Sequence, residues 1–244
     1  MRLSALYFGP DNDGIDDELT IYLSAADESG IGRWSFEIRE PQAPNFLFYK
    51  WEGTGAPPAE LKWDGYSADG HELVQSAEEY RYVFTAADTL DNVSSLGGGI
   101  QVDILVFYER DLNLYRARVP AIVFGSNSGG FEGLPRETMD NNDWILRRIA
   151  QTLNKDRFSA LRVKVEGHSN PTTTPNTRAR QQELRGLQSL SELRAKTVVD
   201  YLEGIGVDRS RMNYVGIGAS RPIVTYEDRD NWWKNRRVEF LLDR

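Results

Sequence analysis

The sequence predicts two folded domains: an all-β sandwich over residues 1–112 and an α/β domain of order β-α-β-α-β over residues 113–244. The first half alternates apolar and polar residues, whereas the second half also contains apolar stripes with helical spacing. Residues 1–112 hold 7 Lys+Arg and 21 Asp+Glu, a net charge of −14, and residues 113–244 hold 22 and 16, a net charge of +6. We expect two separately solvated surfaces, with docking of opposite charges as the alternative.

Composition places the chain among globular proteins. It has 244 residues, of which 40% are hydrophobic and 27% are charged. No apolar run approaches the roughly 20 residues that span a bilayer, so we expect any export signal or anchor to lie upstream of these residues. Cysteine is absent, which excludes disulfides and thiolate metal sites.

Strand signals dominate the first half. Apolar and polar residues alternate over residues 19–23, 34–39, 80–85 and 102–106, a pattern typical of half-buried strands. Turn residues such as Asp64-Gly65 separate these runs. Regularly spaced short strands of this kind predict an immunoglobulin-like sandwich.

Motif order supports the same assignment. The opening Phe8-Gly9-Pro10-Asp11-Asn12-Asp13-Gly14 resembles that of secreted bacterial Ig-like modules, and Trp63-Asp64-Gly65 with the later Tyr80-Arg81-Tyr82 resembles the FlgD-type Ig-like repeat. The resemblance implies an extracytoplasmic spacer or adhesive module.

The acidic loop near the start is a candidate calcium site. Asp11, Asp13, Asp16 and Asp17 place carboxylates at spacings that Ca²⁺ could use. The loop is not an EF-hand, because the bidentate Glu is lacking. The alternative is a solvated strand entry rich in Asx turns, and no other cofactor is expected.

The second half alternates strands and helices. We expect strands over residues 115–124, 161–167, 212–216 and 237–242. One helix should start at an N-cap Asp140 and run to about residue 155, and another should cover residues 183–203. Residues 171–182 are expected to form a loop over the site.

Several motifs in this half resemble the OmpA-like C-terminal domain family, which includes Pal and MotB. They are Val165-Glu166-Gly167-His168-Ser169-Asn170, Leu190-Ser191 with Arg194-Ala195, and Asn235-Arg236-Arg237-Val238-Glu239. The resemblance covers about residues 115–244 and implies an α/β sandwich that binds the diaminopimelate of peptidoglycan. Together with the first module, it resembles multimodular envelope proteins of spirochaetes, treponemes in particular.

The resemblance also implies a ligand pocket, whose acids are missing here. Arg194 matches the arginine that takes the ligand carboxylate, and Arg236 or Arg237 matches a second basic contact. Where the family has acidic or amide contacts for the ammonium, this chain has Asn170, Gly125 and Leu187. The remaining expected pocket residues are Ser191 and His168.

Loss of these contacts should weaken binding of a zwitterion. Charge-assisted hydrogen bonds contribute about 1.5–3 kcal/mol each, so we expect diaminopimelate binding to be absent or weak and an anion to be favoured. Alternatively, Arg194 forms a structural ion pair with Glu239 or Asp200. His168 is expected to be structural rather than a metal ligand.

The predicted function is that of a non-enzymatic structural or interaction protein of the periplasm, held at the outer membrane by an upstream region. With His71 and His168 as its two histidines, a Ser-His-Asp arrangement is poorly supported, and scattered basic residues argue against nucleic acid. Possible partners are peptidoglycan or an anionic ligand and other envelope proteins. The alternatives are a genuine peptidoglycan anchor and an adhesin or partner-binding module acting through the Ig-like half.

Overall fold

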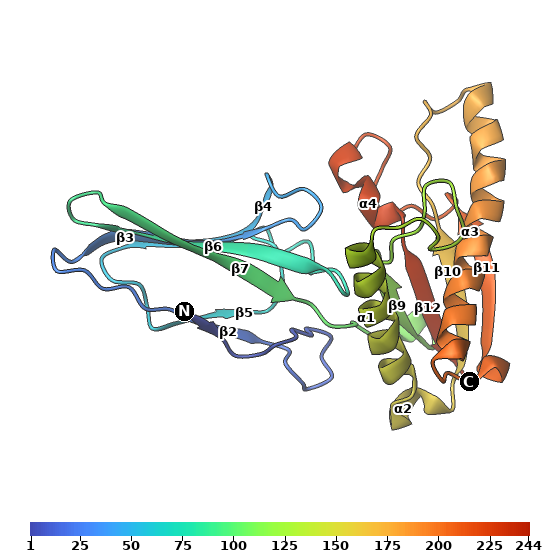
Figure 1. Cartoon of the computed structure of the whole chain (residues 1–244), viewed down its shortest axis with the longest axis horizontal. Coiled ribbons are helices and arrows are strands. Elements are labelled where there is room, and N and C mark those ends of the chain that lie inside the picture. Colours follow the sequence, from blue (N-terminus) through green and yellow to red (C-terminus); the bar gives the residue numbers. More distant parts are fainter. The chain divides into compact units, whose positions relative to one another are not determined.

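The computed structural model describes residues 1–244 and divides the chain into two compact units, Met1–Asp103 and Ile104–Arg244 (Figure 1). The division precedes the expected boundary after residue 112. The reason is β8 (Phe107–Glu109), which pairs with β9 (Leu114–Val119) and thereby joins the sheet of the second unit. Every helix is too short or too polar to span a lipid bilayer.

The first unit is built from two antiparallel sheets and contains no helix. One sheet has the order β1-β2-β5 and the other the order β4-β3-β6-β7. Their strands are β1 (Arg2–Leu3), β2 (Leu19–Tyr22), β3 (Ile31–Arg39), β4 (Leu47–Thr54), β5 (Glu60–Trp63), β6 (Glu79–Asp88) and β7 (Val93–Gln101).

An aromatic cluster joins the two sheets. The ring of Trp63, on β5, lies 6.1 Å from Phe48 and 6.5 Å from Tyr80 of the larger sheet. Trp63 is 2% exposed, and its Nε1 donates to the carbonyl of Tyr66. Burial of large aromatic side chains is the main stabilising contribution available to a small sandwich. The sheets therefore share one core.

One predicted strand of this unit is wrong. Val102 makes only an isolated bridge to Phe8, and residues 103–106 belong to no strand. Ile104 and Val106 are nevertheless buried. The alternating apolar pattern therefore predicted the buried side chains correctly but predicted a strand where there is none. The glycine-rich β7, in contrast, carries too weak an alternation to be predicted.

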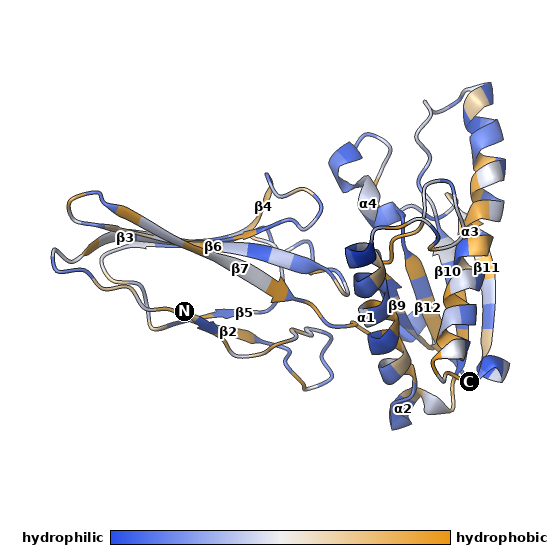
Figure 2. Cartoon of the chain, viewed as in Figure 1, coloured by the Kyte–Doolittle hydropathy of each residue, from blue (hydrophilic) through white to orange (hydrophobic).

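The second unit contains a five-stranded sheet of order β11-β10-β12-β9-β8. Strand β10 (Arg162–His168) runs parallel to β11 (Met212–Gly218) and antiparallel to the central β12 (Val238–Asp243). The helices are α1 (Arg136–Leu153), α2 (Asp156–Ser159), α3 (Arg178–Gly204) and α4 (Trp232–Asn235). Figure 2 shows that β12 is largely hydrophobic, which fits a central strand.

Both long helices cover the same face of this sheet. On β10, a Cβ added to Gly167 would meet the backbone of Ser191, which lies on α3. On β12, the side chain of Phe240 shares a small cavity with Ile149 and Leu153 of α1. Because strand side chains alternate, Glu166 and His168 point to the opposite face. The charged residues on this opposite face are therefore separate from those on α3.

Several predicted boundaries move. The first strand ends at Val119, since Pro120 follows and the chain leaves the sheet. The carboxamide of Asn142, which is 1% exposed, instead bonds both the N–H and the carbonyl of Val123. The first helix starts at Arg136, directly after Pro135, so Asp140 lies inside it and is not its N-cap.

The second long helix starts before the predicted residue 183. Thr177 is its N-cap, and the hydroxyl of Thr177 accepts from the N–H of Arg180 at 3.1 Å. The helix therefore begins at Arg178, and only residues 171–177 form the loop that was expected over residues 171–182.

Candidate functional site

Arg194 is the centre of the candidate pocket. It lies on α3, where its Nε donates to the carbonyl of Ser128 at 3.1 Å. Its guanidinium carbon lies 5.1 Å from the ring centroid of Phe124, a cation–π distance. One loop thus supplies both the carbonyl and the ring that position this guanidinium.

Arg236 is the second cation of the pocket. Burial lowers the pKa of Arg194, and the positive charge of Arg236 lowers it further. Arg236 is exposed to solvent, although partial desolvation of its guanidinium still lowers its pKa. No carboxylate acts on either guanidinium, and neither forms an ion pair. The two arginines therefore make the local potential positive, with solvent screening the charge of the exposed Arg236.

The structure shows how Asn170 is held after the end of β10. Its Oδ1 accepts from Nδ2 of Asn235 at 2.8 Å, and its Nδ2 donates to the carbonyl of Pro171. Asn235 in turn accepts from the N–H groups of Ile223 and Val224 through Oδ1. The oxygen that would face a ligand ammonium is therefore already engaged in a structural network.

Gly125 closes the tight turn that leads to Ser128. Its carbonyl accepts from the N–H of Ser128, and its own N–H donates to the carbonyl of Gly130. A Cβ at Gly125 would lie 3.1 Å from Cβ of Ser128 and 3.2 Å from the carbonyl oxygen of Glu132. A side chain here would force its neighbours to move, so this turn has little room for an aspartate.

Leu187 and Ser191 have different positions on α3. Leu187 lies two turns before Arg194 on the same helical face and offers no polar atom to a ligand. Ser191 is completely buried; its hydroxyl donates to the carbonyl of Gln188 and accepts from the N–H of Gly218. Its contacts therefore fasten α3 to the end of β11.

A carboxylate missed by the sequence interpretation lies on the same helical face. Glu183 accepts four hydrogen bonds, from the N–H and hydroxyl groups of Thr172 and Thr173. Burial opposes ionisation, but these donors lower the pKa of Glu183 to about 2. Arg180 adds a bond to the carbonyl of Thr173. The loop over residues 171–177 is thus folded back onto its own helix.

Arg237 does not lie with Arg194. Its Nη2 and Nε lie 2.6 Å and 2.7 Å from Oε1 of Glu239, which is 1% exposed. Arg116 pairs with the second oxygen of Glu239. The adjacent Arg236 lies between α4 and β12, outside any strand, and makes no such ion pair. The alternative ion pairs of Arg194 are therefore wrong: Glu239 pairs with other arginines, and Asp200 pairs with Lys196.

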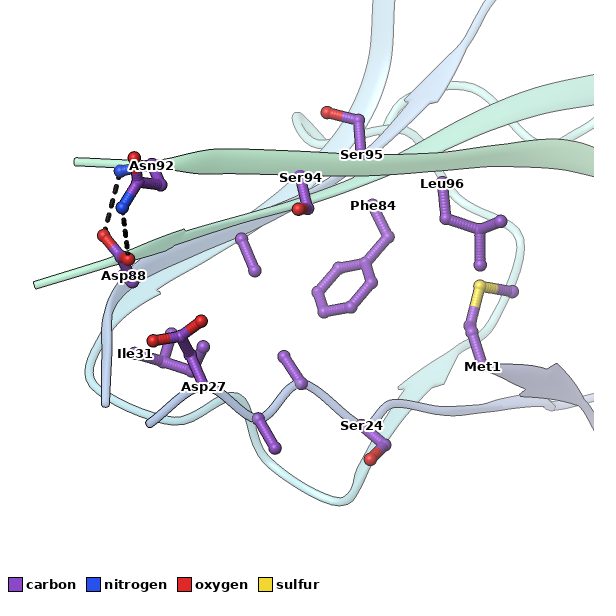
Figure 3. A pocket seen from close by; sticks show the side chains of 13 residues that line it. Met1, Ser24, Asp27, Ile31, Phe84, Asp88, Asn92, Ser94, Ser95 and Leu96 are labelled. Carbon is purple, nitrogen blue, oxygen red and sulfur yellow. Dashed lines mark hydrogen bonds between the residues drawn. The ribbon is translucent and has the colours of Figure 1, made fainter. Parts of the chain in front are cut away.

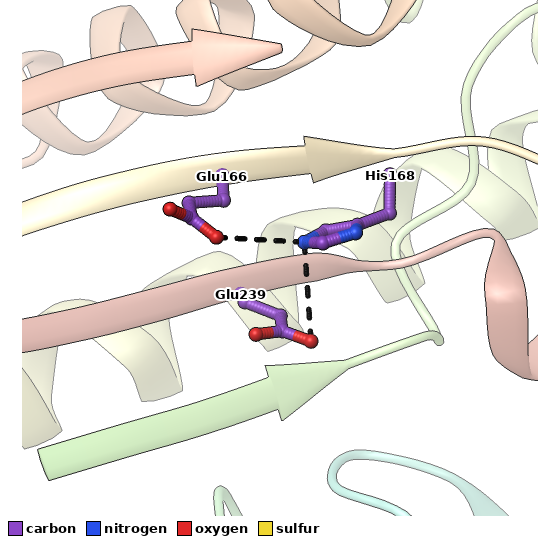
Figure 4. Close-up of side chains that lie close together, drawn as sticks. All are labelled: Glu166, His168 and Glu239. Atoms are coloured by element: carbon purple, nitrogen blue, oxygen red, sulfur yellow. Dashed lines mark ion pairs between the residues drawn. The ribbon is translucent and has the colours of Figure 1, made fainter. Parts of the chain in front are cut away.

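His168 joins this second group instead of the pocket. Figure 4 shows its ring between Glu166 and Glu239, with Nε2 at 3.8 Å and 3.9 Å from their carboxylate oxygens. Burial lowers the pKa of His168, so the ring is neutral at pH 7. Glu166 pairs with Arg221 at 2.7 Å and with Lys164 at 2.9 Å. We call Glu166, His168, Glu239 and their cationic partners the ion-pair cluster.

This cluster has the residue types of a metal site but not its electrostatics. Ligand atoms of Glu166, His168 and Glu239 lie within 4.8 Å of one another. However, every carboxylate oxygen of the two glutamates faces an arginine or lysine nitrogen. A divalent cation would have to displace four positive groups, so the residues fit an ion-pair network better than a metal.

The predicted calcium loop brings three of its four aspartates together. Asp11, Asp13 and Asp17 place carboxylate oxygens within 4.8 Å of one another, whereas Asp16 does not join them. The oxygens of Asp17 accept from the N–H groups of Asn12 and Gly14. Asp16 has a φ of 54°, a left-handed turn conformation. These contacts are those of an Asx-rich turn, and calcium binding stays a prediction.

Comparison with known proteins agrees with the fold. The model of the OmpA family matches residues 139–236. The peptidoglycan-associated lipoprotein of Pseudomonas aeruginosa is 37% identical over 135 residues, which cover 49% of this chain and 75% of that protein. A peptidoglycan-associated lipoprotein of Agrobacterium fabrum is 32% identical over 97 residues, covering 40% of this chain and 49% of the relative.

Solved structures are also similar. A putative MotB-like protein from Desulfovibrio vulgaris has a TM-score of 0.44 and 22% identity, covering 58% of this chain and 78% of the other. The cell wall anchor of the T6SS from Pseudomonas aeruginosa has a TM-score of 0.41 and 25% identity, covering 57% and 86%. On the strength of the sequence relatives, the chain belongs to the OmpA family.

Proposed function

We propose that this chain is a non-enzymatic cell-envelope protein whose OmpA-family unit carries an anion-selective arginine pocket, so that it holds peptidoglycan through diaminopimelate weakly or not at all. The observation that carries the proposal is the pair Arg194 and Arg236, which no carboxylate neutralises. A ligand amino-acid head group carries both signs of charge. A site that offers only positive charge attracts its carboxylate and repels its ammonium.

The environment of Asn170 supports the same conclusion. Its oxygen accepts from Asn235, so an ammonium would have to compete for a neutral acceptor that is already in use. Neutral hydrogen bonds contribute about 1 kcal/mol, against about 1.5–3 kcal/mol for charge-assisted ones. The difference of about 0.5–2 kcal/mol corresponds to a loss of roughly two- to thirtyfold in affinity at Asn170.

The proposed location is the periplasm, with attachment to the outer membrane through a region upstream of these residues. The family membership and the relatives named peptidoglycan-associated lipoproteins support an envelope role. The first unit then acts as a spacer or partner-binding module, and its immunoglobulin-like character is part of this proposal.

Co-sedimentation of the full chain with purified sacculi tests the proposal. We expect the wild-type protein to stay in the supernatant at physiological salt. The variant Asn170→Asp should increase retention, because it places a negative charge at the motif position whose amide oxygen now accepts from Asn235, the residue before Arg236. Asn170→Ser is the matched control, since it changes the side chain without adding charge. Retention of the wild type that Arg194→Ala abolishes would overturn the proposal, and Arg185→Ala, an exposed site on α3, controls for nonspecific binding.

The second candidate function is a true peptidoglycan anchor in which another acid replaces the missing ones. Glu183 lies on the helical face of Arg194 and is the acid considered for this role, but eleven residues, roughly 16 Å of helix, separate the two. Its two oxygens, however, already accept four hydrogen bonds. If Glu183 bound the ligand ammonium, Glu183→Gln would abolish sacculus retention, whereas a purely loop-holding role would leave retention unchanged.

A further inference from the structure

The strand β7 of the first unit is the edge of its sheet, and residues 93–99 have no partner on its outer side; at the end of β7, the carbonyl of Gln101 accepts from the N–H of Phe8. The sheet order is β4-β3-β6-β7, and β7 pairs only with β6, from Val93↔Ala87 to Gln101↔Glu79. Residues 93–99 are all exposed. Its outward-facing N–H and carbonyl groups are therefore available to another extended chain.

This edge lacks the features that normally prevent strand addition. It contains no charged residue and no proline over its full length, Val93–Gln101. The opposite edge, β4, carries Lys50 and Glu52, and β5 alternates Glu60 and Lys62 with apolar residues. The longest uncharged edge in the unit is thus β7.

The glycines of β7 have a local cause and leave the edge flat. A Cβ at Gly98 would lie 2.3 Å from the hydroxyl oxygen of Tyr82, and one at Gly99 would lie 2.5 Å from Cδ of Glu79. Because successive strand residues alternate, Tyr82 covers Gly98 on one face of the sheet and Glu79 covers Gly99 on the other. An incoming strand would meet bare backbone with no side chain to displace.

A groove of about 350 Å³ lies beside this edge, between the two sheets. Figure 3 shows Phe84 at its floor, with Ser94 and Leu96 of β7 pointing into it and Ser95 pointing away. Across the groove lies the segment Ser24–Asp27. The floor is apolar and the rim is polar, as in sites that take side chains of an extended peptide.

The far wall of the groove also has unpaired backbone. The N–H groups of Ser24, Ala25 and Ala26 follow β2, and they make no hydrogen bond within the chain. Two rows of backbone donors and acceptors therefore border one groove. This observation is independent of the composition of β7 and points to an extended polypeptide as the occupant.

Charge restricts the chemistry of that polypeptide. Residues 1–103 hold 6 Lys+Arg and 19 Asp+Glu, a net charge of −13. The groove is lined by Asp27 and Asp88, and by no lysine or arginine. A second copy of this unit would bring an equal negative charge to the edge and be repelled, whereas a basic segment would be attracted.

We propose that β7 and the adjacent groove form a docking site for an extended, basic segment of a partner protein, which adds a strand to the sheet and inserts alternate apolar side chains over Phe84 and Leu96. The main-chain bonds to β7 give affinity, and the acidic surroundings select the partner. The site does not depend on the arginine pocket.

The probe for the test is a capped eight-residue peptide of alternating lysine and valine, titrated into the full chain and followed by amide hydrogen exchange. We expect protection of those β7 amides that do not bond to β6, with affinity falling as salt rises. The same peptide with glutamate in place of lysine should not bind.

Matched variants decide whether the edge is used. Leu96→Lys places a charge at the groove and should weaken peptide binding at least about tenfold. Leu90→Lys changes an equally apolar, exposed residue of the preceding turn and should have no effect. Protection at β4 instead of β7, equal binding of the glutamate peptide, or unchanged affinity of Leu96→Lys would overturn the proposal. A dimer in sedimentation that Leu96→Lys abolishes would assign the edge to a second copy and overturn it too.

Discussion

Two arginine-rich regions of the second unit handle charge in opposite ways. In the ion-pair cluster, Arg116, Arg237 and Arg221 each face a buried glutamate oxygen. In the pocket, Arg194 and Arg236 pair with no carboxylate; desolvation lowers the pKa of both, and the charge of Arg236 lowers that of Arg194 further. The comparison shows that composition alone does not define a binding site: a cation that is neutralised internally stabilises the fold, and one that is not can attract a ligand.

The largest effect should come from breaking the cluster. Glu239→Gln leaves the buried Arg237 without a counter-charge and leaves Arg116 with Glu109 alone, and we expect a loss of about 3–5 kcal/mol in the free energy of unfolding. Far-ultraviolet circular dichroism during urea unfolding measures it, because only the second unit contains helices. Glu203→Gln, which removes an exposed contact with Arg209 at 3.6 Å, should change stability by less than about 0.5 kcal/mol.

A buried acid without a cationic partner should also reduce stability when it is ionised. Glu78 is 5% exposed, and burial raises its pKa to about 7, with Gln42 as its hydrogen-bond donor. Because the folded pKa exceeds the unfolded value, stability should fall as pH rises from about 4.5 to 7 and then level off.

Replacement of Glu78 should have the opposite sign to replacement of Glu239, because Glu239 pairs with buried arginines and Glu78 pairs with no cation. Glu78→Gln should stabilise the first unit by about 2–3 kcal/mol at pH 8 and by nothing near pH 4. Urea unfolding at both pH values, followed by tryptophan fluorescence, measures the difference. Equal stability of both proteins at pH 8 would show that Glu78 is ionised at no cost.

The loop beside the pocket should respond to acid. Glu183 has its pKa lowered to about 2, so its contribution is present above the ordinary pKa and is lost as pH falls from about 4.5 toward 2. Glu183→Gln should remove about 1.5–3 kcal/mol of local stability. Faster amide exchange at Thr172 and Thr173 would report this loss, with Glu192→Gln, an exposed site on α3, as the control.

The smallest effect should come from the pocket itself. Arg194→Met removes a half-buried cation that has no carboxylate partner and keeps much of its apolar stem, so stability should change by at most about 1 kcal/mol in either direction. Arg237→Met, in the cluster, should cost several times more. Comparable losses in the two variants would mean that Arg194 has an internal partner after all.

Much of the second unit could be predicted from sequence because its signals are local. The period of Val163 and Val165 indicated β10, and the motif that contains Gly167 indicated the family, which the relatives confirm. Helix starts were less accurate. Asp140 is the stronger N-cap signal by residue type, yet the two helices start after Pro135 and Thr177. Which residue caps a helix depends on its backbone conformation, and residue type alone does not determine that conformation.

The site could be predicted only in part. Arg194 and Asn170 were named from the motif, but Glu183 was missed because its partners, Thr172 and Thr173, are ordinary loop residues. A carboxylate one helical turn before Leu187 was the available signal. The edge strand β7 was missed for a different reason: Gly97, Gly98 and Gly99 carry no side chains from which a pattern could be read.

By itself, the sequence determined which charges exist and how strand residues such as Glu166 and Gly167 alternate, but it left open whether Arg236 or Arg237 joins Arg194. Only the tertiary structure decided that Arg237 meets Glu239 and that Arg236 meets Arg194. The physical reason is that a charge is defined by its neighbours in space, and these come from strands and helices far apart in the chain.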